Sequence, residues 1–184
     1  MRGQKPSPSQ AKCGWASWFL AALLAAPAAQ ARDYAPQGRC GGYDRVAITS
    51  PAGTCVALVA DEHQGLRAPR RIVEIAPGKF WLIDMGSWMP KQGRLLELTL
   101  PAVPTRSTSN APALRAQTRV LLDKLDRPLG LVKGPNGKVY VGEADKVWRT
   151  AIPSDGQLPV PETVLVSLPA DGAHPLKELA FGLD

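Results

Sequence analysis

The chain has 184 residues, of which 45% are hydrophobic and 21% charged, as in an ordinary folded domain. This composition excludes a chain that is disordered throughout, and its 17 glycines and 18 prolines favour short elements joined by turns over long helices. The net charge of +6 falls to +3 beyond Ala31, because Arg2, Lys5 and Lys12 come before it and no acid does. Since no basic run follows, nucleic acid is not an expected partner.

The N-terminal segment, residues 1–31, has the order of a secretory signal peptide. The basic residues above precede an apolar stretch, Trp15–Ala26, and Ala29-Gln30-Ala31 then supplies a small-x-small cleavage pattern. The stretch is shorter than the ~20 residues that span a bilayer, although an uncleaved N-terminal anchor is the alternative. We expect residues 1–31 to be removed on export to the periplasm or the medium, leaving a mature chain without membrane contact.

Two cysteines, Cys40 and Cys55, follow the predicted cleavage site. An even pair in an oxidising compartment predicts one disulfide, with two free buried thiols as the alternative. The spacing matches no C-x-x-C redox motif, haem site or Cys/His zinc site. We therefore expect an N-terminal disulfide-containing segment over residues 32–65.

The remaining chain predicts short β-strands in a degenerate repeat. The segment from Pro69 to Leu82 matches the segment from Pro128 to Val141 at a constant offset, and a third copy begins at Leu179, which matches Leu131 at a shorter offset. Each copy holds runs rich in β-branched, leucine or aromatic residues, bounded by turn signals. The predicted strands are residues 71–75, 80–84, 94–100, 129–133, 138–142, 146–150, 163–168 and 177–181.

Repeats of about 40–50 residues that each form a small antiparallel sheet are typical of β-propellers. We expect an all-β fold over residues 66–184, a partial β-propeller of about two and a half four-stranded blades. The blades should lie near residues 66–100, 117–152 and 162–184, and residues 101–116 and 153–161 should be loops. Pro77-Gly78-Lys79 and Asn136-Gly137-Lys138 are predicted hairpin turns, where glycine supplies a positive φ.

Four segments together resemble the glucose/sorbosone dehydrogenases. They are Ala68–Ile72, Leu125–Leu131, Val139–Gly142 and His174–Gly182. The resemblance covers roughly residues 40–184 and implies an exported six-bladed propeller that uses pyrroloquinoline quinone and Ca²⁺ to oxidise a small sugar or aldose. It also implies a role for His174, which lies where the family has its catalytic base, at the start of an innermost strand.

The chemistry of sugar oxidation suits a histidine at this position. A neutral imidazole, with an ordinary pKa near ~6.5, accepts the hydroxyl proton as hydride leaves carbon for the quinone. Asp171 lies close enough in sequence to orient that imidazole, although acids in loops are usually solvated. A histidine at a strand start is more often an ordinary surface residue, which is how we interpret His63.

The chain departs from the family where the cofactor would bind. Asp184 falls within the third predicted blade, and the family draws the cationic quinone ligands and the calcium site largely from later blades. Arg67, Arg70 and Arg71 cluster in sequence, but we interpret them as a solvated loop and assign no residue to the cofactor or to a metal. We expect an N-terminal part of such a dehydrogenase, inactive as it stands.

Two other functions remain open. The first is a non-catalytic propeller-type binding module. The second is a lactonase-like propeller hydrolase, which needs metal-binding carboxylates, and Asp84, Glu143 and Asp145 at strand ends are the available acids, expected to be solvated. No G-x-S-x-G, H-E-x-x-H or G-x-G-x-x-G motif occurs. The sequence specifies neither the substrate nor the electron acceptor.

Overall fold

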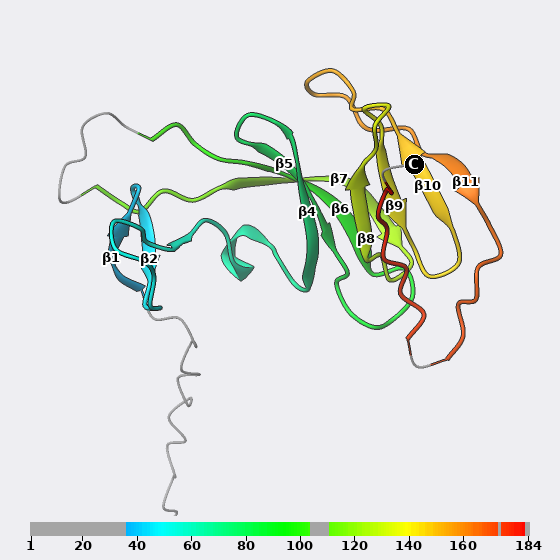
Figure 1. The fold of residues 1–184 in the computed structure, drawn as a ribbon, viewed down its shortest axis with the longest axis horizontal. Helices are drawn as coiled ribbons and strands as arrows, with labels where there is room; N and C mark the ends of the chain where they lie inside the picture. The colour runs from blue at the N-terminus through cyan, green and yellow to red at the C-terminus, as the bar shows by residue number, and fades with distance from the viewer. Residues whose placement is uncertain (1–35, 104–110, 173, 183–184) are drawn as a thin grey trace, which may run out of the picture. The chain divides into compact units, whose positions relative to one another are not determined.

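The computed structural model of the chain describes residues 36–103, 111–172 and 174–182. All of them belong to one compact unit, Asp33–Asp184, and the predicted signal peptide lies outside the described residues. The described part is all-β, apart from one 3-10 turn, η1 (Glu62–Gln64), and its strands form three antiparallel sheets (Figure 1). It contains no helix long and apolar enough to cross a membrane.

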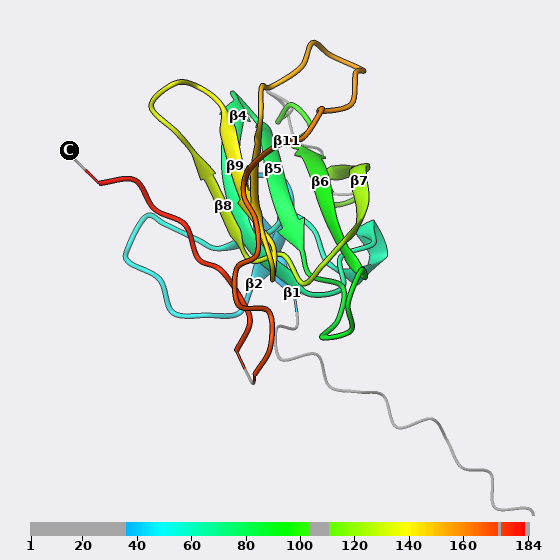
Figure 2. The ribbon, with the colours of Figure 1, turned by 90° about the vertical axis from the view of Figure 1, so that its right-hand side faces the viewer.

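Two consecutive four-stranded meanders confirm the partial propeller. The first blade consists of β4 (Pro69–Ala76), β5 (Lys79–Asp84), β6 (Gly93–Thr99) and β7 (Gln117–Leu125), hydrogen-bonded in chain order. The second consists of β8 (Gly130–Lys133), β9 (Val139–Gly142), β10 (Val147–Thr150) and β11 (Glu162–Leu165) in the same order. Strand β4 contacts β8, so the first strands of the two blades are neighbours (Figures 1 and 2). Seven of the eight predicted strands are present, and β7 was not predicted.

The predicted hairpin turns join the first two strands of each blade. Gly78 and Gly137 have φ angles of 71° and 74°, the left-handed region that glycine enters without steric cost. In the second turn the Asn136 side chain accepts a hydrogen bond from the backbone N–H of Lys138 at 3.1 Å. These turns fix the register of β4 on β5 and of β8 on β9.

The main core lies between the two blades. It is built from inward-facing side chains of both sheets, and Trp81, Ile83, Leu95, Leu121, Leu131, Val139, Val141 and Trp148 are its principal members. The inner strands β5, β6, β9 and β10, which have a hydrogen-bonded neighbour on both edges, are more buried than the edge strands. Burial of large apolar side chains is the dominant stabilising term here, so the blades stabilise each other.

The third blade was predicted near residues 162–184, but its first strand, β11, is the last strand of the second blade, and residues 174–182 form a segment without secondary structure. Residues 177–181 form no strand, so that prediction was wrong, although the segment lies along β8 (Figures 1 and 2). A Cβ atom on Gly130 would lie 2.6 Å from the Lys177 carbonyl oxygen, so this close approach requires glycine. Tyr140 and Phe181 pack edge to face, with ring centroids 5.0 Å apart. The segment lacks a ladder because no described strand pairs with its backbone.

A three-stranded sheet precedes the blades. It comprises β1 (Pro36–Cys40), β2 (Tyr43–Val46) and β3 (Ala57–Leu58), in that order, and the predicted disulfide between Cys40 and Cys55 is present.

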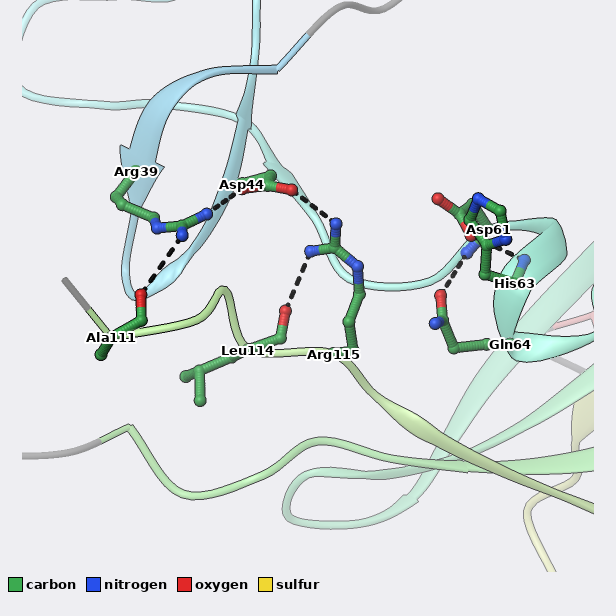
Figure 3. A network of polar contacts seen from close by, with 8 residues as sticks. All are labelled: Arg39, Asp44, Asp61, His63, Gln64, Ala111, Leu114 and Arg115. Carbon is green, nitrogen blue, oxygen red and sulfur yellow. Dashed lines mark hydrogen bonds and ion pairs between the residues drawn. The ribbon is translucent and has the colours of Figure 1, made fainter.

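Asp44 of this sheet forms ion pairs with Arg39 and with Arg115, which lies just before β7 (Figure 3). Arg39 also donates to the carbonyl oxygen of Ala111 at 3.3 Å. The contacts join the N-terminal sheet to the segment that leads into the last strand of the first blade.

Candidate functional site

Each blade has a buried carboxylate at one end, where the chain enters the first strand of that blade. Asp84, at the end of β5, is fully buried and accepts backbone hydrogen bonds from Arg67 at 3.1 Å and Ala68 at 2.7 Å. It also forms an ion pair with Arg94. Burial raises the pKa of Asp84, but hydrogen bonds from Ala68, Arg94 and Gly86 together hold it below its ordinary value.

The second blade repeats this arrangement with a different acid. Glu143, which follows β9, is 2% exposed and accepts a hydrogen bond from the backbone N–H of Asp126 at 2.6 Å. Its other oxygen accepts from the Trp148 indole at 2.7 Å and lies 3.5 Å from the Lys146 ammonium. The expectation that Asp84 and Glu143 are solvated was wrong, because the backbone that enters each blade needs acceptors there. Asp145 is exposed, as expected.

His174 lies at the start of the segment that follows β8. Its side chain is exposed, and no hydrogen bond or ion pair joins it to another described residue, Asp171 included. The segment itself is fixed: the Lys177 ammonium donates to the carbonyl oxygens of Pro169 and Pro175, both at 2.6 Å, and Glu178 forms an ion pair with Arg71 at 2.7 Å. The structure therefore presents an accessible imidazole on an anchored segment.

The other residues considered in the sequence have different surroundings. His63 is exposed, as predicted, and lies in η1, where its backbone N–H donates to the side chain of Asp61 at 2.8 Å (Figure 3). The Arg67 side chain lines a hollow, and Arg70 lies over the Trp88 ring, 5.6 Å from its centroid. With Arg71 paired to Glu178, the three arginines form no common clamp.

The described residues do not fit a quinone and a calcium ion around His174. A multiply anionic quinone needs several free cations, but Arg71 and Lys177, the cations on or in contact with this segment, are already bonded to Glu178 and to two carbonyls. Calcium takes six to eight oxygen ligands. In the described ranges, no group of three or more Asp, Glu, His or Cys side chains is placed to hold a metal.

A cavity of about 360 Å³ opens between the blades, at the end opposite to His174. Ile75, Trp81 and Leu121 supply apolar walls on the first blade, and Ile152 faces them from the connection between β10 and β11. Ion pairs rim the opening: the Lys79 ammonium lies 2.6 Å from Asp155, and Arg119 lies 3.3 Å from Glu97.

Two residues that line this cavity each have a donor buried behind its walls without an acceptor. The indole Nε1 of Trp81, a residue 1% exposed, has no hydrogen-bond partner among the described residues, and the same holds for Arg119 Nε. Leaving a buried N–H unbonded is unfavourable. The cavity could not be predicted from the sequence, because its walls come from both blades and from residues 152–157. The only available signal was the polar stretch Ser154–Gln157 within a predicted loop.

Comparison with known proteins places the chain in no family: no family model, no curated protein and no solved structure matches it.

Proposed function

We propose that the chain is an exported propeller protein of the glucose/sorbosone dehydrogenase type, in which His174 provides the base for oxidation of a sugar or aldose hydroxyl. The observation that carries the proposal is the exposed His174 imidazole at the start of a segment that lies beside β8. Strand β8 in turn lies beside β4, so the segment has the position of the next blade's first strand. Its accessibility allows a hydroxyl to approach within hydrogen-bonding distance, which proton abstraction requires.

We further propose that the described residues alone do not turn over sugars. A base contributes roughly 10²–10⁴-fold to a proton transfer, but it cannot accept a hydride. Hydride acceptance belongs to a bound cofactor that the protein must hold and orient. Because the cations on and beside the His174 segment are committed to other partners, a quinone near it lacks the contacts that would fix it.

The test compares the purified chain with its His174→Ala variant. Fluorescence titration should show weak binding of pyrroloquinoline quinone, and dye-linked oxidation of aldoses in the presence of Ca²⁺ should stay near background. His63→Ala is the matched control, since it removes an exposed imidazole elsewhere. Robust quinone-dependent activity that is lost only in His174→Ala would contradict the inactivity and support the base.

If the coding region continues beyond residue 184, the longer protein tests the base directly. Its dehydrogenase activity should fall at least about 100-fold with His174→Ala and should not change with His63→Ala. Full activity of His174→Ala in that protein would refute the role of His174.

The inter-blade cavity favours a second candidate, a propeller-type binding module. Its volume lies in the range of small-molecule sites, ~300–1,000 Å³. The ion pairs at the rim, Lys79 with Asp155 and Arg119 with Glu97, balance in charge and favour an uncharged ligand.

Glucose is a suitable first probe of the cavity. It should change the tryptophan fluorescence of the native chain but not that of Ile152→Trp, after subtraction of the added fluorophore, because the larger ring fills the cavity. If glucose changes the fluorescence of Ile152→Trp as much as that of the native chain, glucose binds outside this cavity.

A further inference from the structure

A basic hollow lies at the entry end of the first blade. Its volume is about 450 Å³. Its walls come from two connections, the one before β4 and the one between β5 and β6, together with the start of β6 and the end of β7. The lining residues are Arg67, Lys91, Gln92, Arg94, Asp123 and Lys124. We propose that the basic hollow binds the phosphate group of a small phosphomonoester, independently of the function proposed for His174.

The charge of the basic hollow is positive and largely uncompensated. Arg94 is paired with Asp84, and the same nitrogen donates to the Gly65 carbonyl oxygen at 2.7 Å. The side chains of Arg67, Lys91 and Lys124 form no ion pair with any residue in the described part of the chain. With Asp123 as the remaining acid, three cations face one anion. The lining therefore has a net charge of about +2.

Arg94 adds a guanidinium group whose position is fixed. It lines the basic hollow and is bonded to Asp84 and to the Gly65 carbonyl oxygen, so it is oriented before a ligand arrives. Preorganised groups lose little conformational freedom on binding, which favours affinity.

The backbone provides an independent observation. Lys91 and Lys124 both have φ = 57°, a left-handed conformation that side chains other than Gly, Asn and Asp rarely adopt. Among the described non-glycine residues only four have positive φ, and two of them line this hollow. Strained backbone conformations concentrate at binding sites, where a side chain that serves the function is retained although its backbone is strained. Glycine would relieve the strain at both positions but would remove the ammonium group.

The size of the charge selects the ligand. A phosphomonoester carries about −1.5 to −2 at neutral pH, which matches the net charge of the lining. A carboxylate or a phosphodiester, including a lipid headgroup such as phosphatidylglycerol, carries only about −1 and leaves one cation unmatched. Guanidinium groups donate to phosphate oxygens in a fork, and ammonium groups act as point charges beside them.

Calorimetric titration with inorganic phosphate, at constant ionic strength maintained with chloride, tests the proposal. The chain should bind phosphate, and the double substitution Lys91→Gln/Lys124→Gln should weaken binding about tenfold or more. Lys133→Gln, which removes an exposed lysine at the end of β8, is the matched control and should leave the affinity unchanged. No binding to the native chain, or equal binding to the double variant, would overturn the proposal.

Two further measurements separate a binding site from a merely basic surface. Lys91→Gly/Lys124→Gly should lose phosphate binding and yet unfold at a higher temperature than Lys91→Gln/Lys124→Gln, because glycine relieves both strained positions. In sedimentation with phosphatidylglycerol vesicles, any binding of the chain to the vesicles should be displaced by phosphate. Retention of phosphate binding in the glycine variant, or vesicle binding that resists phosphate, would overturn the assignment of a phosphomonoester to these lysines.

Discussion

Asp84 and Glu143 occupy the same position in consecutive blades, at the offset that separates the first two copies of the repeat, although one is an aspartate and the other a glutamate. Their backbone donors correspond as well, since Arg67 and Asp126 are separated by the same offset. Each acid lies at or just after the end of the second strand of its blade, where it accepts hydrogen bonds from the backbone of the connection that precedes the first strand. A carboxylate buried in this way is unfavourable unless it is fully bonded, and both are.

Replacing Asp84 should destabilise the first blade severely. Asp84→Ala leaves Arg94 without its partner and three backbone N–H groups without an acceptor, so we expect a loss of about 3–5 kcal/mol in the free energy of unfolding. Urea unfolding followed by tryptophan fluorescence measures it. Asp155→Ala is the control, because that carboxylate is 90% exposed in its pair with Lys79 and its loss should barely move the urea midpoint. Equal midpoints for the two variants would contradict the structural role.

Asp84 should also make the fold sensitive to acid. Its pKa is lower in the folded chain than in the unfolded chain, so its contribution is fully present above its unfolded pKa of about 3.9. That contribution is lost as the pH falls below this value and through the lower folded pKa. Acid titration of the urea midpoint should therefore show a steep decline below about pH 4. The decline should be shallower in Asp84→Ala, and an identical pH dependence would argue against the linkage.

Glu162 offers a contrast at the surface. Hydrogen bonds from Arg149 and then from Lys138 lower its pKa to about 2. The Glu162 side chain is 53% exposed, however, and ions screen such pairs. We expect Glu162→Gln to change neither the urea midpoint nor its acid dependence measurably in 0.5 M NaCl. A midpoint shift as large as that of Asp84→Ala would show that the pair is more strongly coupled than its exposure indicates.

The disulfide should stabilise the N-terminal sheet and not the blades. Cys40 and Cys55 close a loop of 15 residues, for which chain entropy gives about 3 kcal/mol. In Cys40→Ser/Cys55→Ser, amide exchange should accelerate in β1, β2 and β3 and stay slow in β5 and β9. Intact mass after alkylation without reductant provides the chemical check, since two modified thiols in the native chain would exclude the bond.

The outer edge of the second blade should promote self-association. Among the strands that the structure describes, β11 pairs only with β10, and Val164, Leu165 and Val166 on and after it are 43%, 52% and 66% exposed. An exposed apolar edge strand is a template for pairing with another chain. Sedimentation velocity should show concentration-dependent association that Val164→Lys reduces, with Val103→Lys, outside the sheets, as the control. Monomeric behaviour of the native chain at all concentrations would remove the basis for this prediction.

Much of the blade architecture could be predicted from sequence, because local patterns determine it. Apolar runs with turn signals at Gly78 and Gly137 located both hairpins, and the constant offset between the first two copies of the repeat matched β8 and β9 to β4 and β5. Strand β7 was missed because Gln117–Leu125 carries charged residues on its exposed positions and follows a long segment rich in Pro and Ser. Residues 177–181 have a strand-like sequence, but a strand also needs a backbone partner, which sequence alone does not supply.

The candidate sites were less accessible to sequence analysis. The position of His174 followed from a motif, but its lack of bonded neighbours depends on where Asp171 and Lys177 point. The basic hollow collects Arg67 and Lys91 from two connections and Lys124 from β7, which are far apart in the chain. Their convergence depends on how β4, β6 and β7 pair, so no local pattern marks it.

The position of the buried acids also bears on how such a chain could lengthen. Asp84 and its donors fall within one interval of the sequence, and Glu143 and its donor fall within the next, so neither contact crosses from one interval to the other. Tandem duplication of a gene segment that begins near Arg67 and ends near Leu125 would copy the acid together with the backbone it binds. Each new copy would then arrive with its buried charge already neutralised, before any substitution adapted it to its neighbours.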